Sequence, residues 1–212
     1  VLITRENLYN LPYSVEEIYG MHSSGKYQNT KKVYQEIYRI YSNNSDFPIK
    51  PQKIITEDSN SGYEFFKSVS LEKKISCESS NGKSNIFSML KNVDNEEVCV
   101  IADGAAIGPE MNRLYVQTTK KKNIKLYLPE SFEWVILNSG LIDGKRVREI
   151  LEQPEKYIDS RSYFSWERYF TDLLITETGD SYLKYQKAKL NLAYLHERNK
   201  DIILKSIKGI SF

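Results

Sequence analysis

The chain has 212 residues, with 30 Lys and Arg against 28 Asp and Glu, which gives a formal net charge of +2. This near balance excludes a strongly basic nucleic-acid coat but leaves room for a local basic groove. The two cysteines exclude a disulfide-stapled scaffold and a four-cysteine zinc site. No apolar run approaches the ~20 residues that a membrane span needs, and the charged residues right after Val1–Thr4 predict no signal peptide. We expect a cytoplasmic protein.

The first 43 residues carry the patterns of a strand and two helices. Residues 1–4 are predicted as a short buried strand, and a capping-box spacing predicts a short helix over residues 15–19. Apolar and tyrosine residues at helical spacing predict a second helix over residues 28–43. Between them, Gly20–Lys26 satisfies the G-x-x-x-x-G-K pattern. Because Tyr27 replaces the Ser or Thr that binds Mg²⁺ in a P-loop, we predict a plain Gly/Ser turn there.

Residues 53–141 alternate short apolar strands with helical patterns. The strands are predicted at residues 53–56, 75–77, 98–102 and 124–128. Residues 98–102 are continuously apolar, which is typical of a central parallel strand buried on both faces. Such alternation indicates parallel strands joined by right-handed helical crossovers.

The pattern changes after Leu141, where only helices are predicted, over residues 145–152, 163–177 and 190–207. We therefore predict an α/β domain over residues 1–140, with an open parallel sheet and flanking helices. A helical C-terminal extension over residues 141–212 is expected to pack on it.

Segments that contain acidic residues, or a Gly-Lys-Ser turn able to bind a phosphate, follow the four predicted strands. Glu57 and Asp58 follow the first strand, residues 78–85 the second, residues 103–110 the third and residues 129–133 the fourth. In an open parallel sheet, ligands bind beyond these carboxyl ends. Gathered carboxylates repel one another, and a divalent cation such as Mg²⁺ relieves that repulsion while it also binds phosphate oxygens. The pattern suits metal-assisted phosphodiester chemistry.

Each acidic residue also has a plainer interpretation, because the helix dipole favours carboxylates near helix starts. Glu110, Glu130 and Glu133 stand where ordinary first turns are expected. The coincidence of four strand ends favours a functional site more than any single residue does.

Three segments resemble the motifs of one family. Ile54–Asp58 followed by Ser61–Tyr63 resembles a strand ending in a Glu, Gly82–Ile86 resembles a Gly-Lys-x-Asn-like turn, and Val98–Ala105 resembles a strand ending in Asp-x-Asp. Their order is similar to the Toprim family, the metal-dependent domain of topoisomerases, bacterial primases and OLD-type nucleases. The resemblance covers residues 53–130.

The resemblance implies acid–base work for Glu57 and a Mg²⁺ or Mn²⁺ ligand in Asp103. The second aspartate of the family's pair is Ala105 in this chain, so another acid would have to replace it. The candidate metal ligands are Glu57, Asp58, Asp103, Glu110 and Glu130. The candidate phosphate-binding residues are Gly82, Lys83, Ser84 and Asn85.

The leading hypothesis is a metal-dependent, phosphodiester-processing protein, a nuclease that acts on nucleic acid. The replacement at Ala105 motivates an alternative, a non-catalytic module that binds a nucleotide, a nucleic acid or a partner protein. A third alternative is a small-molecule enzyme on a flavodoxin- or Rossmann-like sheet. Gly104–Gly108 is similar to a dinucleotide turn, but it reads G-x-x-x-G instead of G-x-G-x-x-G.

Overall fold

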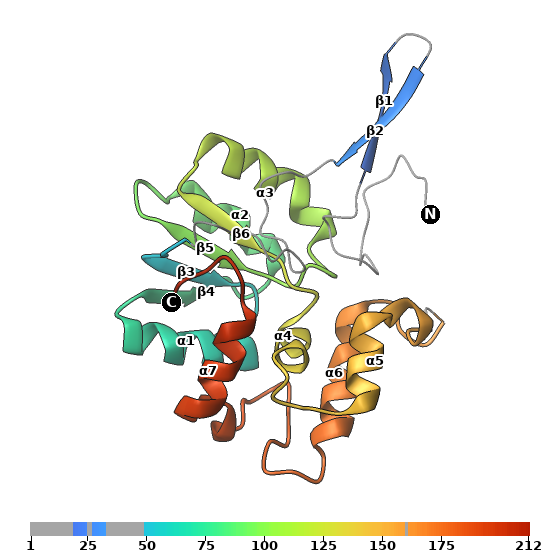
Figure 1. The fold of residues 1–212 in the computed structure, drawn as a ribbon. Coiled ribbons are helices and arrows are strands. Elements are labelled where there is room, and N and C mark those ends of the chain that lie inside the picture. Colours follow the sequence, from blue (N-terminus) through green and yellow to red (C-terminus); the bar gives the residue numbers. More distant parts are fainter. Residues whose placement is uncertain (1–18, 25–26, 33–48, 160) are drawn as a thin grey trace.

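The computed structural model describes residues 19–24, 27–32, 49–159 and 161–212 (Figure 1). Its main sheet has four parallel strands in the order β4-β3-β5-β6. These strands are β3 Lys53–Thr56, β4 Ser76–Ser79, β5 Val98–Ile101 and β6 Ile124–Tyr127. The predicted α/β fold with an open parallel sheet is confirmed.

Helices cover both faces of this sheet. The crossover helices are α1 Ser61–Lys73, α2 Lys83–Lys91 and α3 Gly108–Lys120. Successive strand residues point to opposite faces, so Ile55 and Val100 join the apolar cluster of α2 and α3, whereas Ile54 and Cys99 join that of α1. Pro109 lies in the first turn of α3, where its missing N–H costs no hydrogen bond.

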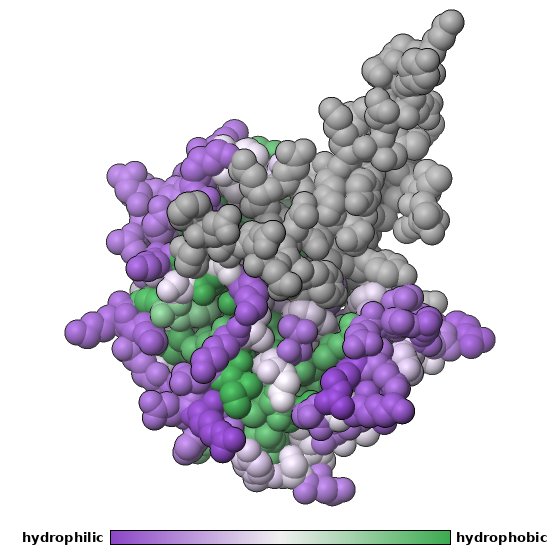
Figure 2. Space-filling model, viewed as in Figure 1, coloured by the Kyte–Doolittle hydropathy of each residue, from purple (hydrophilic) through white to green (hydrophobic). Residues whose placement is uncertain are grey.

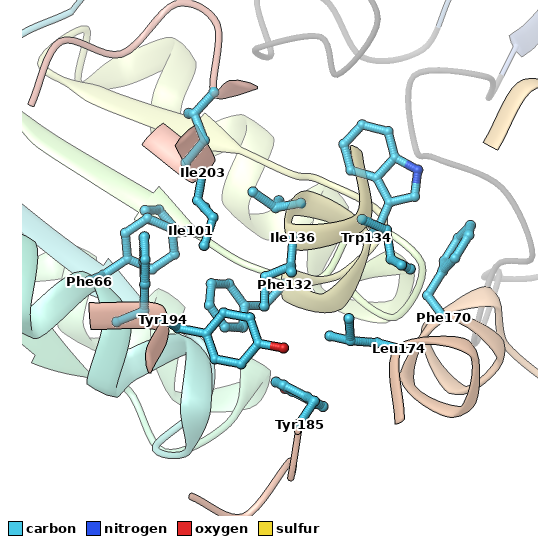
Figure 3. Close-up of a cluster of buried hydrophobic side chains, with 14 of the residues drawn as sticks. Phe66, Ile101, Phe132, Trp134, Ile136, Phe170, Leu174, Tyr185, Tyr194 and Ile203 are labelled. Atoms are coloured by element: carbon cyan, nitrogen blue, oxygen red, sulfur yellow. The ribbon is translucent and has the colours of Figure 1, made fainter. Parts of the chain in front are cut away.

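Helix α4 (Phe132–Asn138) lies at the centre of the larger apolar cluster. Its residues from Phe132 to Leu137 are all buried, as expected of a helix that is enclosed on every side. Figure 3 shows Phe132 and Ile136 between Phe66 of α1 and Leu174 of α6. The helices that follow α4 therefore share one core with the sheet.

The C-terminal part is helical, with two differences from the predicted bounds. Its elements are α5 Lys145–Glu152, η2 Pro154–Lys156, α6 Trp166–Thr178, η3 Leu192–Leu195 and α7 Glu197–Ser206. Helix α6 begins three residues later than predicted. The single helix predicted over residues 190–207 is wrong, because His196 is extended (φ −61°, ψ 133°) and separates η3 from α7.

The helix predicted over residues 28–43 is wrong for its first five residues. Strand β2 (Tyr27–Lys32) pairs antiparallel with β1 (Tyr19–Ser24). Asn and Thr in β2 have low helix propensity, which outweighs the helical spacing of its apolar neighbours. Residues 20–24 of the predicted turn are likewise strand. The predicted strand at residues 1–4, residues 15–18 of the short helix and the rest of the second helix lie outside the described residues.

Among the coloured residues of the face shown in Figure 2, hydrophilic ones lie mainly at the periphery and hydrophobic ones gather near the centre. No helix in the described parts of the chain has both the length and the apolar character that crossing a bilayer demands.

Candidate functional site

A small cavity of about 120 Å³ lies at the carboxyl end of the parallel sheet. Its charged lining comes from four places: the ends of β3 and β5, the first turn of α4, the first turn of α6, and the loop before η3. The charged residues that line it are Glu57, Asp58, Asp103, Glu133, Glu167 and Lys187. This is the edge at which the sequence predicts a ligand site.

Glu57 and Asp103 form the centre of the site. Glu57 follows β3 directly, and Asp103 lies two residues after the end of the neighbouring parallel strand β5. The backbone N–H of Glu57 donates to Ile101 O at 2.9 Å. The Glu57 side chain in turn accepts a hydrogen bond at Oε2 from the Asp103 N–H, at 3.1 Å. The sheet register thus holds the two predicted acids side by side.

Burial and mutual repulsion favour the protonated form of both acids. Burial is the main cause that raises the pKa of Glu57 to about 7; the Glu167 carboxylate adds to the effect, while the Asp103 N–H and Lys83 oppose it. Burial also raises the pKa of Asp103 well above its ordinary value. The nearby carboxylates of Glu167, Glu57 and Glu133 raise this pKa further, by smaller amounts. These acids are ones that a bound cation would help to ionise.

Two further acids complete the site, and sequence reasoning did not assign them to it. Glu133 is buried in the first turn of α4, and Glu167 lies half-buried in the first turn of α6. Glu133 was visible as an acid after the fourth strand, but its helix-start position favoured the plainer interpretation. Nothing local in the sequence connects Glu167 with the sheet edge.

Lys187 is the basic residue among those that line the cavity. Its Nζ forms an ion pair with Glu167 Oε1 and lies 4.0 Å from Glu133 Oε1. Burial by itself disfavours the ammonium, but Glu133 and Glu167 outweigh it and raise the pKa of Lys187. The lining therefore has five carboxyl groups and one lysine, and the lysine pairs with two of them.

Asp58 lines the cavity but also stabilises the start of α1. Its Oδ2 accepts a hydrogen bond from the Gly62 N–H at 3.1 Å, and its carbonyl accepts bonds from the hydroxyls of Thr56 and Ser79. Burial raises the pKa of Asp58, and the backbone N–H of Gly62 opposes this rise. Asp58 lies two residues before the N-cap Asn60, and its side chain satisfies an N-terminal N–H of α1 as a capping side chain does.

We expect Asp58→Ala to lower the free energy of unfolding by about 1 kcal/mol, because it removes an acceptor for an N-terminal N–H of α1. Asp58→Asn keeps an acceptor oxygen and is expected to unfold within about 0.5 kcal/mol of the original chain. Urea unfolding of both variants checks this. Loss of Mn²⁺ binding in Asp58→Asn with unchanged stability would instead make Asp58 a ligand.

Two predicted metal ligands do not line the cavity. Glu110 lies in the first turn of α3 and forms an ion pair with Arg113. Glu130 is buried in the loop between β6 and α4. The structure thus brings Glu57, Asp58 and Asp103 together and leaves Glu110 and Glu130 outside the lining.

The predicted phosphate-binding turn contacts the backbone of Glu57 and lies outside the cavity lining. Gly82 immediately precedes α2 with φ 115°, and its N–H donates to Glu57 O at 2.8 Å. Lys83 Nζ donates to Ala106 O at 2.6 Å, and Asn85 Nδ2 donates to Ser80 O at 3.0 Å. Ser84 is exposed. None of these four residues lines the cavity, so the turn supports the backbone at Glu57.

The donor set fits a hard divalent cation in its chemistry, since carboxylate oxygens are the ligands that Mg²⁺ and Mn²⁺ prefer. Among the described residues, however, no group of three or more His, Cys, Asp and Glu side chains is arranged closely enough to hold a metal ion. Two of the carboxylates, those of Glu133 and Glu167, pair with the Lys187 ammonium instead.

Comparison with family models, curated proteins and solved structures found no significant match to this chain.

Proposed function

We propose that this chain is a Toprim-like, metal-dependent protein that processes phosphodiester bonds in nucleic acid, as a nuclease. The observation that supports it is the meeting of Glu57 and Asp103 with Glu133 and Glu167 in one cavity at the carboxyl edge of a parallel sheet. Five carboxyl groups in the lining, Asp58 included, against one lysine favour a divalent cation there.

In this proposal each acid has a role, and a bound cation would have to draw its ligands together, since no such group is preformed among the described residues. Asp103, Glu133 and Glu167 would hold Mg²⁺ or Mn²⁺, which when bound would polarise a phosphoryl oxygen. Glu57, with a pKa raised to about 7 chiefly by burial, is suited to accept a proton from an attacking water near neutral pH. Glu133 and Glu167 would supply the charge that the family's second aspartate provides.

The residue in place of that aspartate has a structural role. Ala105 is fully buried and belongs to the apolar cluster beneath the site. A carboxylate at this position would enter an apolar core, which is unfavourable without a partner. This supports a site whose remaining ligands come from α4 and α6.

The test is a cleavage assay on plasmid DNA and single-stranded RNA with Mg²⁺ or Mn²⁺ added. We expect metal-dependent cleavage, and a fall of at least about a hundredfold in Asp103→Asn because a ligand to the cation is lost. Glu110→Gln is the matched control and is expected to cleave like the original chain, since Glu110 lies outside the cavity lining. Equal activity in Asp103→Asn would refute the proposal.

The second candidate is a non-catalytic module that binds a nucleotide, a nucleic acid or a partner protein at the same edge. The absence of a preformed three-carboxylate group among the described residues favours it. It predicts Mn²⁺-independent binding of a nucleic acid or nucleotide and no cleavage by any metal-loaded preparation.

A further inference from the structure

A larger pocket lies where the loop after α6 enters η3; this loop crosses the lower end of the view in Figure 1, between α6 and α7. Its volume is about 390 Å³, which is within the range of pockets that hold small ligands. One short segment lines it, with Lys184, Gln186, Lys189, Leu190, Asn191 and Leu192. Two of these residues are basic and none is acidic, so the pocket favours an anion.

The sequence around this pocket is also basic. Residues 181–196 contain three lysines and no Asp or Glu, although acids and bases are nearly balanced in the whole chain. Lys184 and Lys189 are exposed, and neither forms an ion pair with any residue that the structure describes. Ammonium groups without an acidic partner are suited to pair with phosphate oxygens.

The same loop offers contacts for a nucleobase. Leu183 and Tyr185 are buried, whereas the alternate residues Tyr182, Lys184 and Gln186 are exposed. Tyr182 is 71 % exposed, and an exposed aromatic ring is a surface on which a base can stack. The Gln186 amide can donate to and accept from the edge of a base. An aromatic ring, an ammonium and an amide on one side of a loop therefore fit a nucleotide better than a phosphate group alone.

Hydrogen bonds fix the backbone of this loop. Asn191 Nδ2 donates to Tyr182 O at 2.9 Å and to Lys184 O at 3.2 Å, which ties the exposed residues to the pocket lining. The Tyr194 hydroxyl donates to Leu183 O at 2.6 Å, and the backbone N–H of Leu190 donates to Glu64 Oε2 at 2.6 Å. A backbone that is already ordered lowers the entropic cost of binding a ligand.

We propose that this loop binds single-stranded nucleic acid: Lys184 and Lys189 pair with phosphates of the strand, and a base stacks on Tyr182. The proposal deepens the proposed function and rests on it for the class of ligand. Lys187 of the same loop lines the acidic cavity, so a strand bound here would lie next to the carboxyl edge of the sheet. Stacking on a protein side chain requires an unpaired base, which favours a single strand over a duplex.

Fluorescence anisotropy with a labelled oligothymidylate in EDTA tests this binding in the full chain without any divalent cation. Lys184→Gln/Lys189→Gln is expected to bind about tenfold more weakly. The slope of log K against log salt concentration should fall by about 1.4, because each phosphate contact of a single strand contributes about 0.7. Tyr182→Ala is expected to bind at least about fivefold more weakly with an unchanged slope, because a stacking contact is lost and no charge is removed.

The matched control is Lys73→Gln/Lys120→Gln. It removes the same two charges from exposed positions at the ends of α1 and α3, which lead into β4 and β6 at the opposite edge of the sheet. It is expected to leave the affinity within about twofold. Equal affinities of the two double variants would overturn the proposal, because the total charge of the chain would then account for the binding.

Competition identifies the ligand. Unlabelled oligothymidylate is expected to displace the probe, whereas inorganic phosphate and phosphatidylserine vesicles at the same phosphate concentration are not. Equal displacement by the vesicles would make the loop a lipid-binding surface, and equal displacement by phosphate would make it an anion site; either result overturns the proposal.

The binding assay and the cleavage assay separate this proposal from the proposed function. Metal-dependent cleavage that is the same in Lys184→Gln/Lys189→Gln, together with unchanged binding, would overturn the strand-binding loop and leave the nuclease. Binding that depends on Lys184 and Lys189, without cleavage in any metal, would support the loop and refute the nuclease.

Discussion

Replacing Glu57 by Gln is expected to stabilise the fold at pH 8 by up to about 3 kcal/mol in the presence of EDTA, and to abolish the proposed metal-dependent cleavage. The side-chain oxygen of Gln can still accept the hydrogen bond that Asp103 N–H donates to Glu57. The variant therefore removes a charge and keeps the contact.

The sign follows from proton linkage. Burial raises the pKa of Glu57 from an ordinary 4.5 to about 7 in the folded chain. Between these values the folded state binds more protons than the unfolded state, so stability falls as pH rises from about 4.5 to about 7. Gln does not ionise and escapes this loss. The advantage of the variant is fully developed above pH 7 and disappears near pH 4.5.

Urea unfolding at pH 5 and pH 8, with EDTA in both buffers, measures the effect. Glu152→Gln, a change at the exposed end of α5, serves as the control and is expected to behave alike at the two pH values. If Glu57→Gln lost stability at pH 8, the Glu57 carboxylate would be a stabilising group there and the repulsion inferred for the cavity would be absent.

Glu57→Gln is thus expected to raise stability and to lower the proposed cleavage activity. Opposite effects of this kind are expected when a functional site is built from charges that repel one another. A cluster of half-buried acids lowers stability unless something neutralises it. Lys187 neutralises part of the charge in this structure, and the proposed divalent cation would neutralise more. The proposed cation would thus relieve a cost that the acidic cavity imposes on the stability of the fold.

The sheet and the central pair of acids could be predicted because they depend on local patterns. Apolar runs predict the strands, and parallel strands necessarily present their carboxyl ends at one edge, which places Glu57 beside Asp103. The pairing of Glu110 with Arg113 also follows a local rule, since residues three apart are neighbours on a helix. That rule would have removed Glu110 from the ligand set.

The rest of the site depends on tertiary packing. Glu133 and Glu167 meet only because α4 is enclosed between the sheet and α6, and no periodicity shows which helices enclose it. Lys187 and Tyr185 come from an irregular loop whose path is fixed by contacts with Ser61 and Glu64. Such long-range contacts leave no spacing signal in the sequence.

Replacing Gly104 by Ala is expected to destabilise the fold by about 3 kcal/mol. A Cβ at this position would lie 2.7 Å from Leu128 O and 2.9 Å from Pro129 O. Both are backbone atoms, and Gly104 N–H donates to Pro129 O at 2.5 Å, so the two loops cannot separate without losing this bond. The cause is the close approach of two chain segments, which no rotation of a side chain relieves.

Gly179→Ala is the control for Gly104→Ala, because a Cβ there would meet Ile175 O at an ordinary 3.5 Å and its φ of −51° suits alanine. It is expected to unfold within about 0.5 kcal/mol of the original chain. Equal stability of the two variants in urea would show that the loops after β5 and β6 do not approach as described. Because Gly104 adjoins Asp103, the clash would also move that carboxylate away from Glu57, and Mn²⁺ affinity should fall together with stability. The same close approach therefore maintains the fold and the geometry of the acidic cavity.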